Sequence, residues 1–178
     1  MHRLKTHITF IFLVFSFSII SCNTTVSNEV ITEEKDSIKE EIKITAKDIE
    51  SIKYTEYALS DLAEKATRDW AKFEELKTQI ELLKKADFSF FDDENALLST
   101  FFTDFRNQIP KDLAVHAIQV RMTVFETTSF KLEGISKLQR VEKATKIEYI
   151  KDVLVSYSNL ILQINKKLER DSQKIEKP

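Results

Sequence analysis

Apolar residues recur at alternating steps of three and four along most of the chain, the spacing that places side chains on one face of an α-helix. The first such stripe lies within residues 38–86, and only Thr45 and Glu56 on it are not apolar or small. Its members are Ile38, Ile42, Ile49, Ile52, Leu59, Ala63, Ala66, Trp70, Phe73, Leu76, Ile80 and Leu83. The pattern predicts one long helix over 38–86.

A second apolar face covers residues 93–133 and is interrupted at Pro110. It comprises Leu97, Leu98, Phe101, Phe102, Phe105, Ile109, Leu113, Ala114, Ala117, Ile118, Val124, Phe125 and Leu132. Proline has no backbone N–H and disfavours an α conformation in the residue before it, so this arm is either kinked or broken at Pro110. Gly134 is predicted to end the arm as a left-handed C-cap residue.

The most regular stripe lies within residues 136–171. Its apolar positions are Ile147, Ile150, Leu154, Tyr157, Ile161, Ile164 and Leu168. Ser136 and Gln139 have the spacing of a capping box, which predicts the start of the last helix. Three arms of similar length predict an all-α domain over 38–172: an antiparallel bundle with coiled-coil-like packing, or four helices if Pro110 breaks the middle arm. Residues 173–178 are predicted to fray.

Composition supports long helices with few turns. The chain contains one glycine and two prolines, where average usage would give roughly 12 and 9. Its formal net charge of −2 argues against a nucleic-acid partner, because such proteins carry clustered basic residues.

The N-terminus has the layout of an export signal. Residues 1–7 carry Arg3 and Lys5 and no acid, and residues 8–20 are almost entirely apolar. A short basic region followed by 7–15 apolar residues is typical of a secretory signal peptide. The apolar run is too short for a membrane-spanning helix, which needs about 20 residues.

The segment Ile19-Ile20-Ser21-Cys22 resembles the lipobox of bacterial lipoproteins. This resemblance covers only the N-terminus. It implies a signal peptide over residues 1–21, cleavage between Ser21 and Cys22, a diacylglyceryl group on the Cys22 sulfur and acylation of the new amino group. Residues 22–37 are then the lipidated cysteine and a flexible tether.

Lipidation would place the protein in the bacterial cell envelope, anchored in a membrane by two or three acyl chains. In enterobacterial lipoproteins an Asp after the cysteine favours retention in the inner membrane, so Asn23 favours the outer membrane. Cys22 is the sole cysteine, and an acylated cysteine leaves no thiol for a disulfide or for catalysis.

Candidate catalytic residues are few. His116 is the one histidine beyond the signal, and Asp112 lies one helical turn before it. A metal site needs further ligands, and the Glu-x-x-His motif of di-metal bundles does not occur. The acidic run Asp92, Asp93, Glu94 and Asn95 has neither the alternation nor the glycine of a calcium loop. The sequence predicts no metal, no cofactor apart from the covalent lipid, and no enzyme.

Six phenylalanines lie within residues 88–105. Two interpretations remain open: the rings close the end of the bundle as core, or Phe88, Phe90 and Phe91 form an exposed contact patch.

The leading functional hypothesis is a lipid-anchored, non-enzymatic helical protein that contacts another envelope protein, as a complex subunit, a chaperone-like holder, or an immunity or exclusion factor. The alternative is a bundle that binds a small apolar ligand near Trp70, Phe101 and Phe105. A metal enzyme would require acids from other arms to meet His116.

Overall fold

A computed structural model describes residues 43–92, 95–138 and 140–173. The chain divides into two units, Met1–Glu40 and Glu41–Pro178, and the described residues all belong to the second. Within them the secondary structure is entirely helical. The elements are α2 (Ala46–Glu50), α3 (Asp61–Thr67), α4 (Ala71–Lys84), α5 (Ser89–Asp92), α6 (Asn95–Asn107), the 3-10 helix η1 (Lys111–Leu113), α7 (His116–Ser136) and α8 (Lys143–Ser172).

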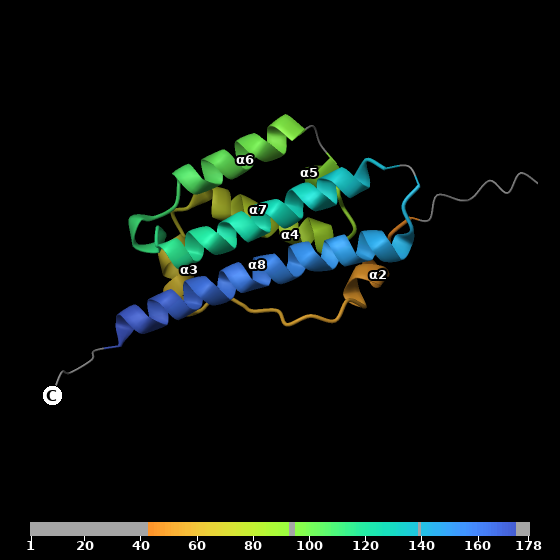
Figure 1. The fold of residues 1–178 in the computed structure, drawn as a ribbon. Coiled ribbons are helices and arrows are strands. Elements are labelled where there is room, and N and C mark those ends of the chain that lie inside the picture. Colours follow the sequence, from red (N-terminus) through yellow and green to blue (C-terminus); the bar gives the residue numbers. More distant parts are fainter. Residues whose placement is uncertain (1–42, 93–94, 139, 174–178) are drawn as a thin grey trace, which may run out of the picture. The chain divides into compact units, whose positions relative to one another are not determined.

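The two longest helices, α7 and α8, lie side by side and run in opposite directions (Figure 1). Helices α5 and α6 pack against α7, while α2 and α3 pack against α8, and α4 contacts α6. None of the helices described here is both long enough and apolar enough to cross a bilayer. The prediction of an all-α domain is therefore confirmed, whereas the bundle of three long helices is not.

The core between these helices is rich in aromatic side chains. Its largest fully buried members are Trp70, Phe73, Phe91, Phe102, Phe105 and Phe125. They come from α4, α5, α6 and α7 and from the residue before α4. The apolar face of α8 lies against them, and the predicted stripe on this helix is confirmed: Ile150, Leu154, Ile161 and Ile164 are buried.

The first predicted helix is wrong as a continuous element, because residues 52–60 are not helical. Side chains of α8 replace the missing helical hydrogen bonds of this extended segment. Ser158 accepts a hydrogen bond from the Tyr57 N–H (2.9 Å) and donates one to the Thr55 carbonyl (2.8 Å). Asn165 accepts from the Ser60 N–H (2.9 Å) and donates to the Ala58 carbonyl (2.8 Å). These two side chains lie two turns apart on α8, so they fix the segment along one face of that helix.

Of the kink and the break predicted as alternatives at Pro110, the structure has the break. Pro110 cannot donate to Arg106, and the Ile109 N–H bonds the Arg106 carbonyl instead (3.3 Å). The Phe105 carbonyl therefore loses its intrahelical donor, and the Trp70 indole N–H donates to it (3.0 Å). Helix α6 thus ends at Asn107, and η1 connects it to α7.

The predicted C-cap at Gly134 and capping box at Ser136 are both wrong. Gly134 does not have a positive φ, and α7 runs through it to Ser136. The helix continues because Leu132 and Glu133 are buried and the Lys137 N–H still reaches the Glu133 carbonyl. Helix α8 begins at Lys143 with Glu142 as its N-cap, and Gln139 lies outside the described residues.

Helix α4 ends in a Schellman motif with a strained residue. The Asp87 N–H bonds the Leu82 carbonyl (3.0 Å) and the Ala86 N–H bonds the Leu83 carbonyl (2.9 Å). Ala86 has φ 63°, a left-handed conformation that costs an L-residue roughly 1–2 kcal/mol. The chain therefore places alanine where glycine is the usual residue.

We expect Ala86→Gly to raise the free energy of unfolding by about 0.5–1 kcal/mol, because relief of the strain outweighs the added freedom of the unfolded chain. Urea unfolding followed by circular dichroism measures the change. Ala144→Gly, at an exposed position in the first turn of α8, is the matched control and should instead destabilise by about 0.5 kcal/mol. Equal destabilisation by both substitutions would contradict the strain at Ala86.

Candidate functional site

The predicted contact patch is largely part of the core. Phe91 has no exposed surface, and Phe88 and Phe90 are partly buried against the core. The Phe90 ring packs edge-on against Phe91 and Phe101, with centroid distances of 5.0 and 4.9 Å. Phe91 therefore offers no surface to a partner in this conformation, whereas Phe88 and Phe90 keep some exposed surface.

At the interior position predicted near Trp70, Phe101 and Phe105, the rings of Trp70 and Phe105 pack directly against each other, while Phe101 also lines a hollow of about 290 Å³. Trp70 and Phe105 are stacked with centroids 4.5 Å apart, and both are fully buried. Phe101 stacks on Phe105 at 6.0 Å. The stacked rings of Trp70 and Phe105 therefore leave no room for a ligand between them.

A pocket of about 410 Å³ lies at the end of the domain where the described chain begins. We call it the end pocket. Its walls come from residues 43–44, the segment from Ala86 to Asp92, the end of α7 and the start of α8. The lining residues are Lys43, Ile44, Ala86, Phe88, Asp92, Leu132, Ser136, Lys146 and Ile150.

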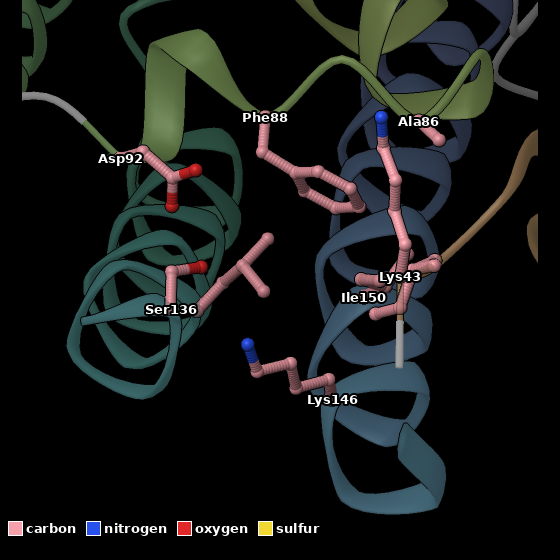
Figure 2. Close-up of a pocket in the computed structure, with 9 residues that line it drawn as sticks. Lys43, Ala86, Phe88, Asp92, Ser136, Lys146 and Ile150 are labelled. Carbon is pink, nitrogen blue, oxygen red and sulfur yellow. The ribbon is translucent and has the colours of Figure 1, made fainter. Parts of the chain in front are cut away.

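Figure 2 shows how the labelled side chains surround this space. Phe88 projects from the segment above into the gap between α7 and α8, and Lys146 extends from α8 towards Ser136 on α7. Asp92 lies on the same side as Ser136, and Lys43 lies on the side of α8 and Ile150. The pocket thus combines an apolar surface with two ammonium groups and one carboxylate.

A capping box fixes the N-terminal wall of the pocket. The Asp48 carboxylate accepts from the Thr45 N–H (2.8 Å) and hydroxyl (2.7 Å), and it pairs with the Lys143 ammonium on α8 (2.8 Å). The hydrogen bonds from Lys143 and Thr45 lower the pKa of Asp48 to about 2. Asp48 therefore stays ionised at neutral pH. Its contacts hold Lys43 and Ile44, the two residues before Thr45, beside the start of α8.

The charges of the end pocket differ from those of the other hollows. Lys43 and Lys146 form no ion pair within the described part of the chain. In three other hollows the basic residue is already neutralised. Lys72 pairs with Glu75, Lys84 with Glu56 and Glu81, and Arg106 with Glu126. The end pocket is thus distinguished by lysines that have no ion-pair partner within residues 43–92, 95–138 and 140–173 and that lie beside apolar surface.

Other predicted site residues have simpler positions. His116 is exposed and is the first residue of α7, and Asp112 is exposed in η1. In residues 43–92, 95–138 and 140–173, no three His, Cys, Asp or Glu side chains gather as metal ligands. Cys22 and Ser21 lie outside the described residues, as do Asp93 and Glu94.

Sequence reasoning missed Lys43, Ser136 and Lys146 as pocket residues. Lys43 and Lys146 belong to the charged side of predicted helices, where a lysine is usually solvated, and Ser136 was assigned to a cap. The one available signal was the position of Lys146 directly before Ile147, at the edge of the apolar stripe. The approach of four distant segments creates the pocket, and local spacing does not encode that approach.

Comparison of the chain with protein-family models, with curated proteins and with solved structures finds no match.

Proposed function

We propose that this protein is a lipid-anchored, non-enzymatic binding protein of the bacterial cell envelope, held in a membrane through Cys22. The observation that carries the proposal is the segment Ile19-Ile20-Ser21-Cys22 after a basic start and an apolar run. Two or three acyl chains would give stable anchoring. Asn23 favours the outer membrane as the site of attachment.

The helical domain would then act through contacts with another envelope protein. Phe88 and Phe90 keep part of their surface exposed, and Leu97 on α6 is 57% exposed. Phe90 and Leu97 line one shared hollow on the domain. Apolar surface of this kind supports a docking role, as subunit, holder or immunity factor.

Cys22→Ala is expected to abolish acylation and to release the protein from the membrane fraction, because the sulfur is the attachment point of the lipid. Labelling with a palmitate analogue and fractionation of cells measure both effects. Ser27→Ala, in the predicted tether, is the control and should leave both unchanged. A Cys22→Ala protein that still sediments with membranes, alongside a wild type that takes up no label, would sink the lipoprotein assignment. Crosslinking in intact cells followed by mass spectrometry would identify the partner.

A second candidate function is the binding of a small ligand by the lipid-anchored domain. The observation that favours it is the end pocket, whose volume of about 410 Å³ lies within the usual range of roughly 300–1,000 Å³ for ligand sites. It lies outside the aromatic stack, and its mixed lining differs from the purely apolar site that the sequence predicted.

A further inference from the structure

We propose that the end pocket binds a small anionic amphiphile, meaning an alkyl chain that carries a carboxylate or a phosphate. This inference rests on the second candidate function and names its ligand class. It uses the chemistry of the pocket walls and is independent of the acylation of Cys22.

The apolar part of the pocket suits an alkyl chain. Ile44, Leu132 and Ile150 are buried, and the partly buried Phe88 ring projects between α7 and α8 (Figure 2). Covering the remaining apolar surface with a chain removes it from water, which favours binding in proportion to the apolar area covered. The accessible part of this surface comes from Ala86 and Phe88, which are partly buried, because Ile44, Leu132 and Ile150 keep only 7%, 1% and 0% of their surface exposed.

The ammonium groups select the charge of the ligand. Lys43 and Lys146 line the pocket without an ion-pair partner in the described chain. A neutral ligand that covered them would remove their water and return nothing, which is costly. A carboxylate or phosphate would accept charge-assisted hydrogen bonds from them, which are stronger than hydrogen bonds between neutral groups. The pocket therefore favours an anionic head group over a neutral one.

Asp92 partly offsets the preference of the pocket for an anionic ligand. Its removal therefore tests that preference. Its carboxylate lies on the wall opposite Lys43 (Figure 2), so among the described lining residues two positive charges face one negative charge. An anionic ligand gains from both ammoniums and is repelled by Asp92, whereas a cationic ligand experiences the reverse. Removal of Asp92 should therefore strengthen the binding of an anion and weaken that of a cation.

Photolabelling in lipid nanodiscs tests the proposal with the full chain as cells produce it. The probes are diazirine-bearing alkyl carboxylate, alkyl phosphate, alcohol and trimethylammonium compounds of equal chain length, and peptide mass spectrometry locates the label. We expect the carboxylate or phosphate probe to label the Ala86–Asp92, Leu132–Ser136 and Lys146–Ile150 segments, and unlabelled decanoate to compete. Preference between the two anionic probes would distinguish a fatty acid from a phospholipid as the source of the ligand.

Matched substitutions decide the role of the charges. Lys146→Gln and Lys43→Gln should each reduce labelling by about tenfold, the usual effect of losing one charge-assisted hydrogen bond. Asp92→Asn should increase labelling, and Lys151→Gln, exposed on α8, should leave it unchanged. Circular dichroism of each variant confirms that it folds.

Four outcomes would overturn the ligand class: label outside the pocket, equal labelling by the trimethylammonium probe, a decrease with Asp92→Asn, or unchanged labelling in both lysine variants. Strong labelling of the pocket by the neutral alcohol alone would reject the anion and keep ligand binding. Absence of pocket labelling by every probe would reject ligand binding, while the lipid anchor is judged separately by the Cys22→Ala experiment.

Discussion

Replacement of Trp70 by Ala is expected to lower the free energy of unfolding by about 3–5 kcal/mol. Trp70 is fully buried, and its ring stacks on Phe105 and Phe73 with centroid distances of 4.5 and 5.1 Å. Its indole N–H also donates to the Phe105 carbonyl (3.0 Å), which has no intrahelical donor at the end of α6. The substitution opens a cavity and leaves a buried carbonyl unpaired, so two separate losses add together.

Trp70→Phe separates these two losses. It keeps an aromatic ring in the stack and removes the indole N–H together with part of the ring volume, so we expect a smaller loss of about 1–2 kcal/mol. Urea unfolding followed by near- and far-ultraviolet circular dichroism measures both variants. If Trp70→Ala cost less than about 1 kcal/mol, Trp70 would not be the centre of this core.

Replacement of Ser158 by Ala is expected to lower the free energy of unfolding by about 1–3 kcal/mol, since Ser158 is only 2% exposed and its hydroxyl bonds two backbone groups of the extended segment. Without it, the Tyr57 N–H and the Thr55 carbonyl lose a hydrogen-bond partner at a part-buried position. Asn165→Ala should have a similar but smaller effect, because its hydrogen bonds are exposed.

Hydrogen exchange gives this prediction a direct readout. In Ser158→Ala the Tyr57 amide should exchange faster, while amides of the α7–α8 contact keep their protection. Ser156→Ala is the matched control: Ser156 is buried on the same helix but bonds Thr128 and Val153. Unchanged protection of the Tyr57 amide in Ser158→Ala would show that other contacts hold the extended segment.

The buried positions of the first arm were predictable even though its continuous helix was not. Ala63, Trp70, Phe73, Leu76, Ile80 and Leu83 are all buried, as the stripe predicts. The stripe reports which residues face the core, and short helices joined at an angle can satisfy it as well as one long helix. A local signal for the interruption does exist: the run Ile52-Lys53-Tyr54-Thr55-Glu56-Tyr57 contains four β-branched or aromatic residues, which favour an extended backbone.

By contrast, the candidate site could not be read from local patterns. Lys43, Phe88, Ser136 and Lys146 belong to four segments, and each is unremarkable in its own sequence context. Of the aromatic cluster that the sequence singles out, Phe88 does line the end pocket. In the structure Phe91 is core, and the space beside Phe88 is a pocket whose lysines have no ion-pair partner among the described residues.

The amino-acid sequence by itself determined the all-helical class, an interruption at Pro110, the long last helix and the lipobox resemblance, because each depends on spacing or backbone chemistry within a few residues. Only the tertiary structure decided where residues 52–60 leave the helix and where the end pocket forms. The physical reason is the same in both cases. Both features depend on contacts between distant parts of the chain: Ser158 and Asn165 hydrogen-bond backbone groups about a hundred residues away, and the pocket walls come from four separate segments. The β-branched and aromatic run at 52–57 favours an extended backbone, but local preference does not encode these long-range contacts.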